Sequence, residues 1–276
     1  MSEQRQAGDP ESHVGNLEQR IAAFPAWSYR FEFDGGVATP VFNGAVVNRQ
    51  RQRRRYFFDA LLSATGGSLH GRRVLDLGCN AGFWSLAALE AGADFVLGVD
   101  ARRLHIDQAN LVFEAKDIER SRYRFEQGNV FSHAFEGRFD VVLCLGLLDH
   151  VAKPVELFEV MAAASPELIV IDTEVSRSRT SVFEVDTLYN RENAVEYETV
   201  LIPSRMAVSE LAAQFGFRAT ALAQNMTDYA GLRDYLHQRR LAFICAKDAP
   251  PQELHAEKRS RLPWWITALK ARQRRS

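Results

Sequence analysis

The feature that most constrains the fold is the segment 74–100, VLDLGCNAGFWSLAALEAGADFVLGVD. A short apolar run leads into a loop with two glycines, Gly78 and Gly82; a helix-like stretch follows, and a second apolar run ends at Asp100. Glycine lets a backbone turn tightly and approach a ligand closely. The acid at the end of the second run, 22 residues after Gly78, can accept both hydroxyls of a ribose. The segment therefore predicts a strand, loop, helix and strand that bind a nucleoside cofactor.

The spacing of the two glycines separates two kinds of cofactor. A dinucleotide site needs G-x-G-x-x-G, with a helix N-terminus facing a pyrophosphate. Here the spacing is G-x-x-x-G, and Asp76 stands at the entrance of the loop. A carboxylate near a pyrophosphate is repelled, whereas one near the amino group of a methionine moiety is attracted. The loop therefore favours S-adenosylmethionine (SAM) over NAD.

Apolar runs alternate with helix-like segments along most of the chain. The runs are 74–77, 95–99, 123–125, 139–145, 168–171 and 241–246, and helices are expected near 48–63, 82–91, 104–119, 154–164 and 204–215. Continuous Val, Ile and Leu strands separated by helices predict an α/β fold with a mostly parallel sheet covered on both faces. Ligands bind such sheets at the carboxyl ends of the strands.

The chain divides into four predicted regions. They are a disordered N-terminus over 1–16, a cap and helix region over 17–71, a cofactor-binding domain over 72–248 with a substrate-covering insertion at 176–203, and a tail over 249–276. Within the second region Tyr29, Phe31 and Phe33 alternate as in a strand.

The bulk composition narrows the function classes. The net charge is -1, so no overall basic field draws the whole molecule to nucleic acid or membrane. Its three cysteines form no CxxC pair, so we expect neither a disulfide framework nor a metal site of the zinc type. The N-terminus lacks an apolar signal core, and we find no apolar run near 18 residues. These features fit a cytoplasmic protein.

The motifs DLGCNAG and GVD resemble motifs I and II of the class I SAM methyltransferases. The resemblance implies a three-layer Rossmann-like fold with a seven-stranded sheet. It also implies that the loop glycines contact the methionine part, that the motif II acid binds ribose, and that Asn129 binds the adenine amino group. The implied cofactor-binding residues are Asp76, Gly78, Asn80, Gly82, Asp100, Asn129, Val130 and Leu145.

The fourth predicted strand, FDVVLCLG, places Asp149 and His150 just beyond its end, beside the expected methyl group. Methyl transfer requires the acceptor to be positioned and often deprotonated. His150 has a suitable ordinary pKa for a general base, and Asp149 or Glu174 would orient it or stabilise its charged form. The alternative is that His150 only caps the helix that begins near Pro154.

Further stretches, LGLLDHVAKPVELF, ETVLIPS and RRLAFICAKD, resemble the tRNA wobble-uridine carboxymethyltransferases and their relatives, over residues 37–247. In that family a lysine and the tyrosine of an L-Y-H motif recognise the extra carboxylate of a carboxylated SAM. Here Asp149 takes the place of that tyrosine, the segment VATPVFNG lacks the lysine, and Arg240 matches an arginine. Because an ionised aspartate repels a carboxylate, we predict plain SAM. Arg240 and Tyr189 are the candidate substrate-binding residues.

Two basic segments have alternative interpretations. The arginines at 49, 51, 53, 54 and 55 would either grip phosphate or form a solvated helix face. The tail at 258–276 carries seven Lys and Arg and no acid, around Trp264 and Trp265. It would contact a membrane surface, which would make the protein peripheral, stack on nucleic acid, or dock on the protein itself.

Three functions remain open from the sequence. The first is O-methylation of a small molecule or glycan precursor, which a general base at His150 favours because hydroxyls need deprotonation. The second is tRNA modification at a wobble uridine, by methyl or carboxymethyl transfer, which the closer resemblance supports. The third is a SAM-binding module without catalysis.

Overall fold

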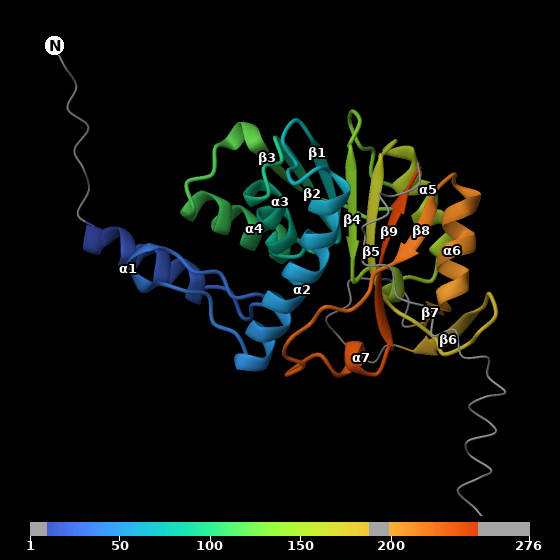
Figure 1. Cartoon of the computed structure of the whole chain (residues 1–276). Helices are drawn as coiled ribbons and strands as arrows, with labels where there is room; N and C mark the ends of the chain where they lie inside the picture. Colours follow the sequence, from blue (N-terminus) through green and yellow to red (C-terminus); the bar gives the residue numbers. More distant parts are fainter. Residues whose placement is uncertain (1–9, 188–198, 248–276) are drawn as a thin grey trace, which may run out of the picture.

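The computed structural model describes residues 10–187 and 199–247. Its main sheet has the strand order β3-β2-β1-β4-β5-β9-β8 (Figure 1). Five strands are parallel: β1 (Arg73–Leu77), β2 (Phe95–Asp100), β3 (Tyr123–Gln127), β4 (Val141–Leu145) and β5 (Leu168–Glu174). The strand β9 (Arg240–Ala246) runs antiparallel to both β5 and β8 (Arg218–Ala221). The predicted α/β fold with a mostly parallel seven-stranded sheet is confirmed.

Helices cover both faces of this sheet (Figure 1). The apolar cluster on one face includes residues from α2 (Gly44–Ala64), α3 (Phe83–Glu90) and α4 (Arg103–Ala115), and the cluster on the other includes residues from α5 (Pro154–Ala163) and α6 (Arg205–Gln214). Successive strand residues alternate between the clusters, as Val74 and Leu75 do. Side chains of a strand point to opposite faces in turn, so a strand covered on both faces must be apolar throughout. That is why inner strands such as β1 and β4 are largely apolar runs in the sequence.

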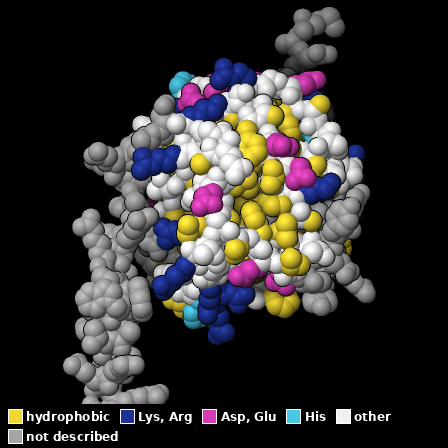
Figure 2. Space-filling model, turned by 90° about the vertical axis from the view of Figure 1, so that its right-hand side faces the viewer, with side chains coloured by type: hydrophobic (Ala, Val, Ile, Leu, Met, Phe, Trp, Pro, Cys, Tyr) yellow, Lys and Arg dark blue, Asp and Glu magenta, His cyan; other side chains and the backbone are white. Residues whose placement is uncertain are grey.

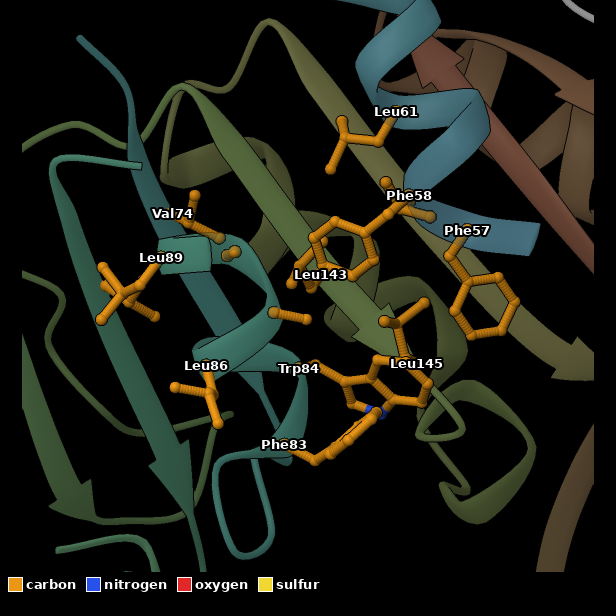
Figure 3. Packing of buried hydrophobic residues seen from close by; sticks show 14 of the residues in the cluster. Phe57, Phe58, Leu61, Val74, Phe83, Trp84, Leu86, Leu89, Leu143 and Leu145 are labelled. Atoms are coloured by element: carbon orange, nitrogen blue, oxygen red, sulfur yellow. The ribbon is translucent and has the colours of Figure 1, made fainter. Parts of the chain in front are cut away.

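The helices α2 and α3 pack directly over the sheet (Figure 3). Phe57 and Leu61 of α2 are each 1% exposed, as is Trp84 of α3. Burying a large apolar side chain contributes about 1.5–3 kcal/mol, so this contact fixes α2 firmly against the sheet. The arrangement matters for the site, because α2 also carries the run of arginines.

The N-terminal region differs from the prediction in two ways. The helix α1 (Pro10–Ala22) begins within the residues expected to be disordered. The alternation at Tyr29, Phe31 and Phe33 does not form a strand, and this segment shows only an isolated bridge, between Glu32 and Ala38, which flank the short helix η1 (Asp34–Gly36). The aromatic residues pack instead on α3, where Tyr29 stacks on the ring of Phe83 at 4.9 Å. The two-residue spacing of these aromatic side chains therefore reflects packing on a helix and not a β-strand.

Several connections were not predicted as regular structure. Two strands of the 176–203 insertion, β6 (Phe183–Thr187) and β7 (Thr199–Pro203), pair antiparallel. Short helices η2 (Arg120–Arg122), η3 (Leu148–His150) and α7 (Arg233–Leu236) complete the described elements. The candidate Tyr189 lies outside the described residues, as does the tail at 258–276, so the membrane and nucleic-acid interpretations of that tail stay predictions.

The outer face on the side of α6 combines apolar and charged surface. Figure 2 shows apolar side chains gathered toward the middle of this face, with charged ones mostly around them. Met206, near the start of α6, is 44% exposed, and Val155 of α5 is 45% exposed. No helix in the described ranges is long and apolar enough to span a membrane.

Candidate functional site

The loop after β1 depends on an unusual backbone. Gly78, Asn80 and Gly82 have φ values of 70°, 49° and 78°, in the left-handed region that glycine adopts without strain and asparagine tolerates. A Cβ at position 82 would lie 3.0 Å from the ring of Phe125, so the site is crowded as well as left-handed. The N–H groups of Gly78 and Cys79 donate to the carbonyl of Val99, which ties the loop to β2. The left-handed backbone therefore explains why glycine stands at both position 78 and position 82.

The acid at the end of β2 lies directly beside this loop. One carboxylate oxygen of Asp100, Oδ2, accepts the N–H of Asn80 at 2.9 Å. The other accepts the N–H of Arg102 at 2.9 Å and lies 2.9 Å from Nδ1 of His105. The structure thus brings together the two motifs that the sequence pointed to. It adds His105, which no motif identified.

Asp76 lies at the end of β1 with only 1% of its surface exposed. The hydroxyl of Ser85 donates to its Oδ2 at 2.6 Å. Burial raises the pKa of Asp76 to about 7, although the hydrogen bonds from Ser85 act in the opposite direction. Burial favours the neutral acid, whereas a neighbouring ammonium group would favour the ionised form.

The predicted adenine contact after β3 is arranged as a turn. Oδ1 of Asn129 accepts the N–H of Phe131 at 3.1 Å, and its carbonyl accepts the N–H groups of Ser132 and His133. The side chain of Val130 packs into the apolar cluster with α5 and α6. An adenine amino group needs an acceptor, and the turn already uses Oδ1 of Asn129 once. The role of Asn129 in adenine binding stays a prediction.

The candidate catalytic residues meet beyond the ends of β4 and β5. Asp149 is 3% exposed, the side chain of His150 is 34% exposed, and that of Glu174 is 40% exposed. Nε2 of His150 lies 3.8 Å from Oδ2 of Asp149. The residue before α5, at its N-cap position, is Lys153, so His150 does not hold that place. A half-exposed histidine beside a buried carboxylate suits proton transfer.

Arg240 joins this group from the first position of β9. Its guanidinium pairs with Oδ2 of Asp149 and lies 3.7 Å from Oε1 of Glu174. Burial by itself would raise the pKa of Asp149, but Arg240, His150 and the hydrogen bonds to the carboxylate together outweigh burial and lower the pKa below its ordinary value. Asp149, which stands where the tyrosine of the resembling family would be, therefore compensates the matching arginine. Arg240 is only 6% exposed, and its substrate contact stays a prediction.

A buried charged cluster lies behind these residues, and sequence reasoning missed its centre. Asp172 of β5 is fully buried and accepts three hydrogen bonds: from the hydroxyl of Tyr235 at 2.6 Å, from Arg53 at 2.8 Å and from Arg240 at 2.9 Å. We define the Asp172 cluster as Arg53, Asp149, Asp172, Tyr235 and Arg240. These side chains come from α2, η3, β5, α7 and β9.

Arg53 lies against α3, the helix that begins directly after the loop following β1, and near Gly146 after β4. Its guanidinium carbon lies 5.2 Å from the centre of the Trp84 ring, and a Cβ at Gly146 would be 3.7 Å from its Nη2. Within the described residues, its Nε is buried without a hydrogen-bond partner, whereas the side chain of Trp84 interacts with the hydroxyl of Tyr29. A buried cationic donor without an acceptor can hold an anionic group such as a carboxylate.

The other arginines of α2 also contact partners within the chain. Arg49 forms two hydrogen bonds of 2.7 Å with Asp234, and Arg51 donates to the side-chain oxygen of Asn48. Arg54 pairs with Glu90, and Arg55 donates to the carbonyl of Asn225. These contacts match neither the predicted phosphate-binding segment nor the predicted solvated helix face in full, because the side chains form hydrogen bonds and ion pairs within the protein.

Comparison with known proteins gives a partial match in sequence. Residues 74–165 match the family described as Methyltransferase domain. The ubiquinone biosynthesis O-methyltransferase of Bordetella avium is 36% identical over 104 residues, 35% of this chain and 39% of that protein. The enzyme of the same name from Bordetella parapertussis is 29% identical over 175 residues, 58% of this chain and 68% of that protein. The chain spans about two fifths of the length of the first curated relatives that it matches.

Solved structures match over most of the chain. The N-terminal domain of EvdMO1, crystallised with S-adenosylhomocysteine (SAH) and D-fucose, has a TM-score of 0.64 and 20% identity, and the match covers 85% of this chain and 97% of that one. Magnesium protoporphyrin IX methyltransferase of Synechocystis, with bound SAM, has a TM-score of 0.54 and 15% identity, covering 89% and 100%. At these identities the likeness concerns the fold. Residues 74–165 therefore match a methyltransferase domain, and the chain has the fold of the solved methyltransferase structures that it resembles.

Proposed function

We propose that this chain is a SAM-dependent methyltransferase that methylates an oxygen of a small molecule or glycan precursor. The observation that carries the proposal is the left-handed loop from Gly78 to Gly82, tied through the N–H of Asn80 to the carboxylate of Asp100. The proposal is supported because this loop allows close approach of a ligand and lies beside a carboxylate that can accept ribose hydroxyls, within the matched segment.

The residues around the loop have complementary roles toward SAM. The loop backbone contacts the methionine part, and Asp100 accepts the ribose hydroxyls. Asp76 favours the ammonium group, whereas the unpaired Nε donor of Arg53 suits the methionine carboxylate. The cofactor is plain SAM, because Asp149 already compensates Arg240 and leaves no free positive charge there for a second carboxylate.

When bound, SAM supplies a methyl group on a good leaving group, so the protein has to orient the acceptor and remove its proton. His150 accepts the hydroxyl proton at a ring nitrogen as the oxygen attacks. Asp149, held ionised by Arg240, stabilises the imidazolium that forms, because its Oδ2 lies 3.8 Å from Nε2. Glu174, at the end of β5, lines the same edge.

The acceptor class is supported by the names of the relatives. The curated relatives are named for O-methylation in ubiquinone biosynthesis, and EvdMO1 was crystallised with D-fucose. A tRNA acceptor is less well supported, because the arginines of α2 that would grip phosphate are engaged within the protein. A hydroxyl on a small molecule or sugar also matches a histidine base.

The test is an untargeted methyl-transfer screen with labelled SAM on cell extract, with and without RNase, alongside calorimetry with SAH. We expect SAH to bind and label to appear in an RNase-resistant small molecule. His150→Gln should lower the transfer rate about 100-fold or more at unchanged SAH affinity. His70→Gln, with its side chain 89% exposed and paired with Asp94, is the matched control.

Each alternative outcome points elsewhere. RNase-sensitive label would indicate a tRNA acceptor instead. Full activity in His150→Gln would remove the histidine base but not the cofactor. Failure of the wild-type protein to bind SAH would overturn the proposed function as a whole.

A further inference from the structure

Asp172 connects two arginines of the site: Arg53, which lies against Trp84 at the start of α3, and Arg240, which pairs with Asp149 beside His150. It is fully buried at the centre of the Asp172 cluster. Its Oδ2 accepts both Arg53 and Arg240, while its Oδ1 accepts the hydroxyl of Tyr235. One carboxylate therefore holds two guanidinium groups that face different parts of the site.

Without Asp172, the Asp172 cluster would carry a net positive charge. Arg53 and Arg240 are two buried cations, and Asp149 and Asp172 are two buried anions. Burial and repulsion by Arg240 would lower the pKa of Arg53, but its pKa is raised above the ordinary value because Tyr235 and Asp172 favour the charged guanidinium. Buried charges are tolerated when they are paired and hydrogen-bonded, so the position of Arg53 depends on the carboxylate between the two arginines.

The position of Arg53 is what matters for the cofactor. Nη2 of Arg53 is committed to Asp172, which leaves Nε as the donor without a partner in the described part of the chain. The guanidinium is also held against the rings of Trp84 and Phe57, at 5.2 and 5.4 Å. Without the anchor at Nη2, this long side chain would gain rotamer freedom and the free donor would lose its direction.

We propose that Asp172 is a positioning residue for the cofactor: with Tyr235 and Arg240 it fixes the guanidinium of Arg53 for the methionine carboxylate. This inference rests on the proposed function and extends it to residues of β5, α7 and β9 that do not touch the cofactor. Cofactor affinity then depends on Tyr235, which lies 63 positions from Asp172 in the sequence.

The experiment measures SAH affinity by calorimetry for Asp172→Asn and Tyr235→Phe, each in the wild-type and in the Arg53→Met background. In the wild-type background we expect affinity to fall at least about tenfold for Asp172→Asn and about threefold for Tyr235→Phe. In the Arg53→Met background each further loss should shrink to less than about twofold, because the residue being positioned is absent. A purely structural role would give the same loss in both backgrounds.

The control is Asp140→Asn, at the opposite edge of the sheet, where the carboxylate accepts the N–H of Arg73 at 2.7 Å. It should keep SAH affinity within about twofold. If Asp172→Asn does not fold, Tyr235→Phe decides alone, since it removes one hydroxyl and keeps every charge.

Three results would overturn the inference. The first is an unchanged affinity in folded Tyr235→Phe, together with either an unchanged affinity or misfolding in Asp172→Asn. The second is equal losses with and without Arg53. The third is absence of SAH binding by the wild-type protein, which would overturn both the proposed function and this inference. In the first two results the wild-type protein still binds SAH, so the proposed function stands.

Discussion

Two regions of this protein meet at the carboxyl edge of the sheet, and they are built in opposite ways. The loop after β1 and the end of β2 lie within 27 consecutive residues, and backbone N–H groups tie them together. The Asp172 cluster joins side chains that lie 63 to 119 positions apart, through charged groups. A site formed by backbone geometry is visible as a short motif in the sequence, whereas a site formed by buried charges from distant positions is not.

The largest expected effect breaks the charged region. Arg240→Met should lower the free energy of unfolding by about 3–5 kcal/mol, because it leaves Asp149 and Asp172 buried with too little positive charge. Urea denaturation with circular dichroism measures the change. Arg54→Met, which removes a half-exposed pair with Glu90, is the matched control and should cost less than about 1 kcal/mol. Equal losses in the two variants would show that the buried cluster contributes nothing special.

The next effect breaks the backbone region. Gly82→Ala should cost about 1–3 kcal/mol of stability and abolish measurable SAH binding, because the residue has a φ of 78° and its Cβ would press on Phe125. Gly66→Ala has a similar φ of 77° but open space around its Cβ. That control should show the strain without the loss of binding. SAH binding retained in Gly82→Ala would contradict the role given to the loop.

The smallest expected effect is a pH dependence of SAH affinity, which arises from Asp76 at the end of β1. The folded pKa of Asp76, about 7, is above its unfolded value of 3.8. Its contribution to stability is therefore present below pH 3.8 and is lost as the pH rises through about 7. A bound ammonium favours the ionised form, so SAH affinity should rise up to about tenfold from pH 6 to pH 8.

Calorimetry across this range checks the expectation. A nucleoside without the amino group, 5′-methylthioadenosine, provides the control and should show no such rise. The same slope for both ligands would mean that Asp76 does not face the ammonium group.

The strands show what a single sequence can predict about the fold. Five predicted runs became the five parallel strands; β1, β2, β4 and β5 are apolar because they are buried on both faces, whereas β3, at the edge of the sheet, includes the exposed Arg124. The strand β8 was missed, since RATA at 218–221 has small and polar side chains and owes its place to pairing with β9. The alternation at Tyr29, Phe31 and Phe33 was misread as a strand, because Tyr29 and Phe31 both pack on Phe83 of α3 while Phe33 lies against Lys116 at the end of α4.

The candidate site divides in the same way. By itself, the sequence determined the loop, its glycines and the acid at Asp100, because tight turns and close approach restrict the residue types over a short span. It offered five arginines between positions 49 and 55 and nothing to distinguish them. Only the tertiary structure decided that Arg53 is buried against Trp84 and Asp172, and that Asp149 pairs with Arg240. The physical reason is that the partner of a buried charge is chosen by three-dimensional proximity, which sequence distance does not encode.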